Sequence, residues 1–150
     1  METISIIIFI AIVIVAIAIV KILLPWIVRL ERKKRKERTN IIFQGLESID
    51  AQSFYERYYR DKGIEIQIIK GIREVLEKVL DADMSRIQPG DDFTKNLKYY
   101  FDSDSMADVE IVVGIEKTFE IKIADEEAQR TKTIDDLIML VKEKIKLKTA

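Results

Sequence analysis

The chain has no cysteine and no histidine, and only two prolines and five glycines among its 150 residues. Without cysteine it can form neither disulfides nor thiolate metal sites, and without histidine only oxygen ligands remain for a metal. The usual pairs of nucleophile and base are therefore missing, and no glycine-rich phosphate loop is present. These absences argue against a metal site and against a zinc, haem or triad enzyme, a hydrolase or a kinase.

Charge is distributed unevenly, although the formal net charge is only −1. Residues 29–38 (RLERKKRKER) carry seven Lys/Arg and two Asp/Glu, whereas residues 81–127 carry five Lys/Arg and thirteen Asp/Glu. Such asymmetry indicates different partners for different parts of the chain. Nucleic acid is not the expected partner, because the acidic region would repel a phosphate backbone and the basic run follows a long apolar segment.

That apolar segment contains eighteen consecutive uncharged residues, from Thr3 to Val20. As a helix they would extend roughly 27 Å, close to the ~30 Å thickness of a bilayer's hydrocarbon core. Lys21 can extend its ammonium group to the interface, and Trp26 lies where interfacial aromatic residues are enriched. We therefore predict a single transmembrane helix over residues 3–28.

A cleavable signal peptide is the alternative, because Ala16-Ile17-Ala18 has the small-residue spacing of a cleavage site. The acidic start, Met1-Glu2, and the length of the apolar run disfavour it, and the lack of a polar face disfavours a buried core helix. Flanks rich in Lys/Arg prefer the cytoplasm. The expected topology is a single-pass membrane protein with its amino terminus outside and residues 29–150 in the cytoplasm.

Residues 29–63 are expected to form a basic and aromatic juxtamembrane linker. Its second part contains Phe54, Tyr55, Tyr58 and Tyr59 at helical i, i+4 spacing, which predicts a short helix with an aromatic face. These rings are expected to pack on the following domain or to rest at the membrane interface. A specific binding surface is the alternative.

The remaining residues, 64–148, have the pattern of a small all-α bundle. Apolar residues on one face predict a helix over about 64–80, and Pro89-Gly90 marks a loop within residues 81–92. A second helix is expected to start at Ser105, and a short turn of helix over residues 126–130. Thr133 with Asp136 three positions later forms a capping box that predicts the start of the last helix.

One motif within this bundle resembles a known family. Asp104-Ser105-Met106 is followed by VEIV at 109–112, GIEKTF at 114–119 and IKIADEEA at 121–128, and TIDDLI begins the last helix. Upstream, Phe93 and Leu97 fit a Phe-x-x-x-Leu pattern. Residues 64–148 thus resemble an acyl carrier protein, a four-helix domain that bears a phosphopantetheine arm.

The resemblance implies a carrier rather than an enzyme. Ser105, preceded by Asp104, would receive 4′-phosphopantetheine from coenzyme A through a phosphopantetheinyl transferase. Carboxylates of the second helix would meet partner enzymes of lipid or acyl transfer: Asp108, Glu110, Glu116 and Glu120. Apolar residues of the bundle would shelter the acyl chain: Val109, Val112, Ile115, Phe119, Ile123 and Ala128.

The expectation is thus a membrane-tethered acyl carrier at the cytoplasmic face. Two alternatives remain: an aminoacyl or polyketide carrier, and a membrane adaptor that keeps the fold without the arm. Ser105 can also form a capping box with Asp108, a role compatible with attachment of the arm. The chain departs from the family at Lys98–Ser103, which replace a short Leu-Gly turn, and at Thr131, where isoleucine is usual. The aromatic residues of this insert suggest a dedicated partner enzyme.

Overall fold

The computed structural model describes residues 2–149, and within these residues it contains helices and no β-strand. The chain divides into two compact units between Glu37 and Arg38. The first unit contains most of helix α1 (Glu2–Ile42). From Ala11 onward α1 is long and apolar enough to cross a membrane, with a mean hydropathy of 2.8 in its most apolar window, none of which is buried.

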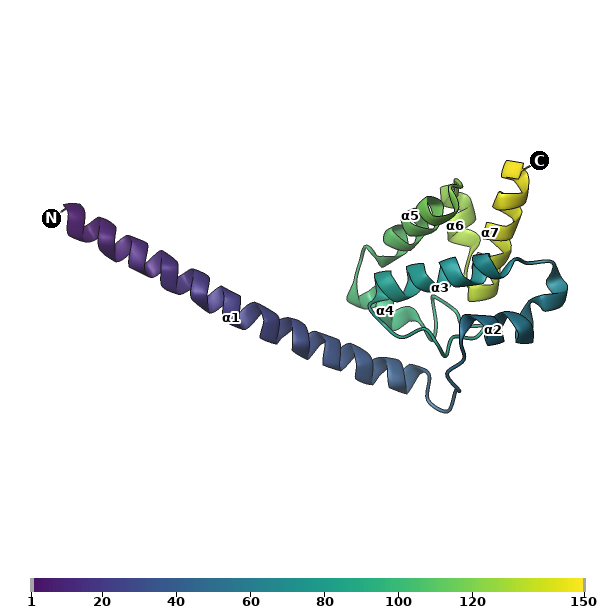
Figure 1. Ribbon diagram of the computed structural model, residues 1–150, viewed down its shortest axis with the longest axis horizontal. Helices are drawn as coiled ribbons and strands as arrows, with labels where there is room; N and C mark the ends of the chain where they lie inside the picture. The colour runs from purple at the N-terminus through teal and green to yellow at the C-terminus, as the bar shows by residue number, and fades with distance from the viewer. Residues whose placement is uncertain (1, 150) are drawn as a thin grey trace. The chain divides into compact units, whose positions relative to one another are not determined.

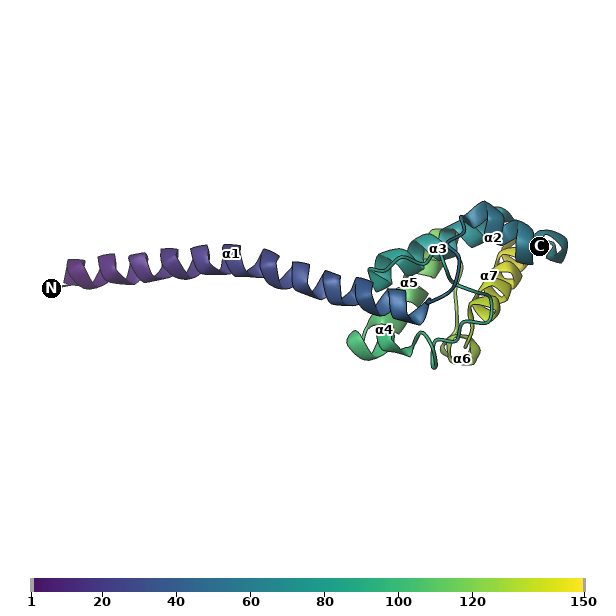
Figure 2. The ribbon, with the colours of Figure 1, turned by 90° about the horizontal axis from the view of Figure 1, so that it is seen from below.

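The second unit is a helical bundle, as the sequence predicted (Figures 1 and 2). Its helices are α2 (Ala51–Tyr58), the 3₁₀ helix η1 (Arg60–Lys62), α3 (Ile66–Leu80), α4 (Lys98–Ser103), α5 (Ala107–Phe119), α6 (Asp125–Arg130) and α7 (Ile134–Thr149). α3 packs against α2, α5 and α7 and is the centre of the bundle. In Figure 2, α2 and α3 lie above, and α4 and α6 below.

The ends of two helices show how local sequence directs this fold. The predicted capping box of α7 is confirmed: the Thr133 N–H donates to Asp136 Oδ2 at 2.9 Å, and the Asp136 N–H donates to Thr133 Oγ1 at 3.1 Å. Helix α5 begins at Ala107, two residues later than expected. The reason is that the Asp104 carboxylate, and not the Ser105 hydroxyl, accepts a hydrogen bond at this end, from the Met106 N–H at 3.0 Å.

Residues 38–62, expected to be part of a linker, belong to the same compact unit as residues 64–148. The predicted aromatic helix is α2, and Phe54 of this helix and Tyr59, the residue after it, pack on the bundle: each is 1% exposed. The Tyr59 hydroxyl donates to Asp135 at 2.8 Å and the Tyr58 hydroxyl to Gln88 at 2.6 Å. The folded unit thus begins earlier than residue 64, because these residues bury their apolar side chains against it.

A buried cation joins this added segment to the bundle. The Arg73 side chain, on α3, is 8% exposed, and its guanidinium donates to the backbone carbonyl of Ile49 at 2.9 Å and to that of Ser85 at 3.3 Å. The Ile49 N–H donates to the same Ser85 carbonyl at 2.9 Å. Burial lowers the pKa of Arg73, but an arginine remains charged, so these charge-assisted bonds stay in place.

Candidate functional site

The predicted attachment residue, Ser105, is exposed in a short turn between α4 and α5. The sequence also allowed a capping box at the start of α5, in which the Ser105 hydroxyl and Asp108 would be partners. In the structure the Asp108 carboxylate instead accepts a hydrogen bond from the adjacent Val109 N–H at 2.8 Å, and the Asp104 carboxylate accepts one from the Met106 N–H. The Ser105 hydroxyl is therefore presented to solvent and is accessible to a modifying enzyme.

Two amide groups at the start of α5 are already hydrogen-bonded to these carboxylates. The positive end of the helix dipole favours Asp104 and Asp108 in this place, as it favours any anion. A phosphate on Ser105 would share this environment with the two acids. The turn therefore presents an exposed hydroxyl, and the Met106, Ala107 and Val109 amides near it are already hydrogen-bonded.

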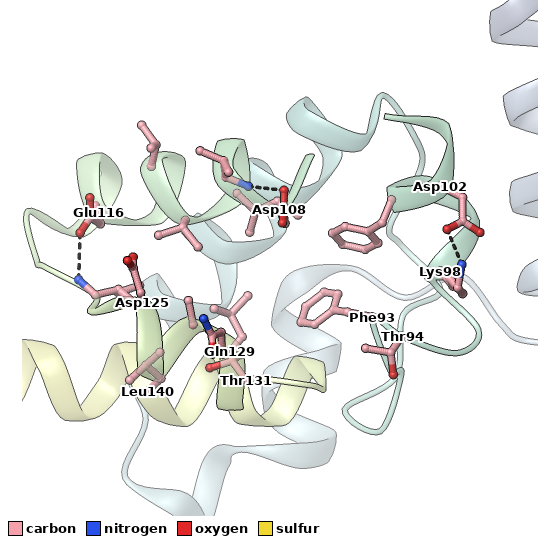
Figure 3. Close-up of a pocket in the computed structure, with 18 residues that line it drawn as sticks. Phe93, Thr94, Lys98, Asp102, Asp108, Glu116, Asp125, Gln129, Thr131 and Leu140 are labelled. Carbon is pink, nitrogen blue, oxygen red and sulfur yellow. Dashed lines mark hydrogen bonds and ion pairs between the residues drawn. The ribbon is translucent and has the colours of Figure 1, made fainter. Parts of the chain in front are cut away.

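A cavity of about 790 Å³ opens beside this turn (Figure 3). Asp102 and Asp108, which precede and follow Ser105 by three positions, both line it. Its walls come from α4, α5, α6, α7 and the segment at Phe93. The lining apolar side chains are Phe93, Phe101, Val109, Ile111, Val112, Val113, Ile123, Ala128, Leu137 and Leu140. An apolar cavity beside an exposed hydroxyl can shelter an apolar group attached there.

The residues that we expected to shelter an acyl chain fall into two groups. Val109, Val112, Ile123 and Ala128 line this cavity. Ile115 and Phe119 do not: Ile115 is 0% exposed within the core, and the Phe119 ring lies over Gly71 of α3. The helical periodicity of α5 marks all of its apolar residues alike, so it could not separate those that face α3 from those that face the cavity.

Several residues that line the cavity were not among those that we expected to shelter an acyl chain. Leu137 and Leu140 lie three positions apart on the apolar face of α7, and Phe93 belongs to the Phe-x-x-x-Leu pattern, so the sequence held a signal for these three. Thr131 also lines the cavity, with its hydroxyl donating to the Glu127 carbonyl at 2.9 Å. Phe101 lies in the insert, for which the sequence offered no packing signal.

The four carboxylates expected to meet partner enzymes have different environments. Asp108 and Glu110 are exposed in the first turn of α5. The Glu116 side chain is only 18% exposed and accepts from the Ile123 N–H at 2.8 Å, a bond that lowers the pKa of its carboxyl. Glu120 ends α5 and pairs with Lys148 at 2.9 Å. Of these four, only the first two make no hydrogen bond or ion pair to another helix or to the α5–α6 loop within the described residues.

Among residues 2–149 no group of three or more His, Cys, Asp or Glu side chains is arranged to hold a metal ion. Three acidic residues around the cavity, Asp102, Asp108 and Glu116, are bonded to backbone amides or paired with lysines. Lys98 pairs with Asp102 at one end of the cavity, and Glu116 lies at the other (Figure 3).

No protein-family model matches the chain. The curated proteins to which it is similar include several acyl carrier proteins. The chain is 35% identical over 72 residues to the acyl carrier protein of Acidothermus cellulolyticus. The aligned residues cover 48% of this chain and 81% of that protein. The acyl carrier protein of Myxococcus xanthus is also 35% identical over 72 residues, covering 48% of this chain and 86% of its own length. The meromycolate extension acyl carrier protein of Mycobacterium leprae is 35% identical over 75 residues, which cover 50% and 62% of the two chains.

Proposed function

The chain belongs to the acyl carrier protein family, and on this premise we propose that it is a membrane-tethered carrier of acyl groups. Its relatives support a carrier role for acyl groups, not an enzymatic one. The arm would be 4′-phosphopantetheine on Ser105, attached by a phosphopantetheinyl transferase. When bound, this group supplies the thiol that the cysteine-free chain lacks, on which acyl groups are held as thioesters.

One observation supports the attachment site most directly. Ser105 is exposed, and Asp102 and Asp108, three positions before it and three after it, line the same apolar cavity. Burial of each methylene of a cargo in such a cavity is worth ~0.8 kcal/mol. Val109, Val112, Ile123 and Ala128 would contribute to this burial, together with Leu137 and Leu140. A chain of several methylenes would be held and still be released to a partner.

The tether would be α1, whose apolar part could span the bilayer. The seven Lys/Arg of residues 29–38 favour the cytoplasmic side for the second unit and attract anionic headgroups. Partners would then be lipid-synthesis or acyl-transfer enzymes at the cytoplasmic membrane face. Tethering raises the local concentration of the carrier near such enzymes, which is the physical advantage of the anchor.

Intact-mass spectrometry of the full chain, co-expressed with a phosphopantetheinyl transferase, tests the attachment. We expect a mass gain equal to one phosphopantetheine arm in the wild type and in Ser103→Ala, which removes the neighbouring hydroxyl. Ser105→Ala should show no gain. If several transferases leave the wild-type chain unmodified, the chain is an adaptor with the carrier fold, and the proposal fails.

A further inference from the structure

Helix α4 is held in place by the segment that precedes α2. We call residues 38–43 the clasp; they are the end of α1 and the residue after it, and they belong to the second unit. Thr39 Oγ1 and Tyr100 Oη are 2.7 Å apart in a buried hydrogen bond, with the two residues 2% and 0% exposed. Beside them, the Arg38 guanidinium lies 5.8 Å from the centre of the Tyr99 ring. The aromatic insert is therefore in contact with another segment of the same chain, the clasp.

This burial gives one ring of the aromatic insert a role within the chain itself. The aromatic insert suggested a dedicated partner enzyme, but the middle ring of the insert, Tyr100, is fully buried. Phe43, at the end of the clasp, is likewise 0% exposed, with the Arg86 guanidinium 5.7 Å from the centre of its ring. Asn40 accepts a hydrogen bond from the same guanidinium at 2.7 Å. The insert and the clasp are thus complementary additions to the carrier fold.

The next residue of α4 belongs to the cavity. Phe101 packs edge to face with Phe93, with ring centres 5.6 Å apart, and both rings line the cavity. Figure 3 shows Phe93, Lys98 and Asp102 at one end of the cavity, and Glu116 and Asp125 at the other. Asp102, which lies at the aromatic end, precedes Ser105 by only three positions.

We propose that Phe101 is a specificity-determining wall of the cargo cavity and that the Thr39–Tyr100 hydrogen bond positions it. Helix α4 has only six residues, too few to be stable in isolation, so its position depends on what it packs against. Tyr100 anchors it to the clasp, and Phe101 projects to the cavity from the adjacent position. Loosening the clasp frees Phe101 to move away from Phe93 and widens the entrance.

The first test needs no cargo and is independent of the attachment of any arm. Hydrogen exchange of the full chain in lipid nanodiscs is compared for wild type, Thr39→Val, Tyr100→Phe and the control Tyr58→Phe. The control also removes one phenolic hydrogen bond, but one made to Gln88. Loss of one buried hydrogen bond corresponds to about fivefold faster opening. We expect that increase for residues 98–103 in the first two variants and not in the control; unchanged exchange there overturns the inference.

The second test uses cargo and rests on the proposed function. The arm is loaded with an acetyl group or with a long saturated acyl chain, and thioester cleavage by hydroxylamine is timed. Tyr100→Phe and Thr39→Val should each accelerate cleavage of the long chain about fivefold. Phe101→Ala should accelerate it as well, with acetyl unaffected in all three variants and Tyr58→Phe like wild type.

The outcomes separate the two proposals. If the wild type protects the long chain and the three variants protect it equally, the inference is overturned while the carrier function stands. If the chain accepts no arm, the proposed function fails, and the exchange measurement alone decides whether the clasp positions α4.

Discussion

Gly114 of α5 lies so close to Val75 of α3 that a Cβ atom on the glycine would come within 2.8 Å of Val75 Cγ1. The same helix pair has a second close approach, because a Cβ on Gly71 would come within 2.6 Å of the Phe119 Cζ. Each helix thus contributes one glycine to the contact. This packing sets the position of α5, which carries the residues that follow Ser105 and one wall of the cavity.

We predict that Gly114→Ala lowers the free energy of unfolding by about 1–3 kcal/mol, because Val75 is stiff and cannot yield to the added methyl. Without the clash, alanine in a helix would instead be more favourable than glycine by ~1 kcal/mol. Urea unfolding followed by helical circular dichroism measures the difference. Gly90→Ala is the control, since its Cβ would have no atom within 4 Å. A Gly114→Ala protein as stable as wild type would contradict this account of the contact.

Asp92 links stability to pH. Hydrogen bonds from the Thr94 side chain and from Lys95, together with the Thr94 backbone bond, lower the pKa of Asp92 from 3.8 to about 2. A lowered folded-state pKa stabilises the fold above the unfolded pKa, and this contribution is lost as the pH falls. We expect the thermal midpoint to drop between about pH 4 and pH 2, with a smaller drop in Asp92→Asn. An equal acid dependence in the two proteins would exclude Asp92 as its source.

Residues close in sequence explain most of what could be predicted. The start of α7 was readable because Thr133 and Asp136 lie three positions apart and cap each other. The face of α3 was readable because its apolar residues recur at helical spacing. Both features depend on interactions within one helix, which a single sequence records directly.

The clasp and helix α4 could not be predicted for the opposite reason. Thr39 and Tyr100 are separated by 61 positions, and no local pattern distinguishes a buried tyrosine from one that faces a partner. Similarly, Val112 and Ile115 are both apolar positions of α5, but only the packing of α3 on one side decides which of them lines the cavity. Such information is contained in the tertiary contacts.

The topology can be tested with introduced cysteines, because the chain has none of its own. In a Ser105→Ala background, which avoids a thiol on the arm, Gln52→Cys should react with a membrane-impermeant maleimide only in vesicles whose cytoplasmic face is outward. Glu2→Cys should react only in vesicles of the opposite orientation. A soluble Gln52→Cys protein that lacks its first residues would instead identify the apolar segment as a cleaved signal peptide.

The carboxylates at the start of α5 differ from the one at its end in their pairing. Asp108 and Glu110 are exposed beside Ser105, whereas Glu120 is paired with Lys148 at the other end of the helix. Exposed charges near a docking site accelerate encounter with a basic partner more than they add affinity.

Neutralising both residues, as Asp108→Asn with Glu110→Gln, should therefore lower kcat/KM for arm transfer to Ser105 about three- to tenfold at low salt. The asparagine retains an oxygen for the Val109 N–H, so the helix should remain folded, which circular dichroism checks. Glu120→Gln with Glu143→Gln removes the same charge away from Ser105 and should have little effect. The difference between the two double variants should shrink as salt is raised to about 1 M, where the Debye length is only ~3 Å. Equal loss in both would mean that overall charge, and not the start of α5, guides the transferase.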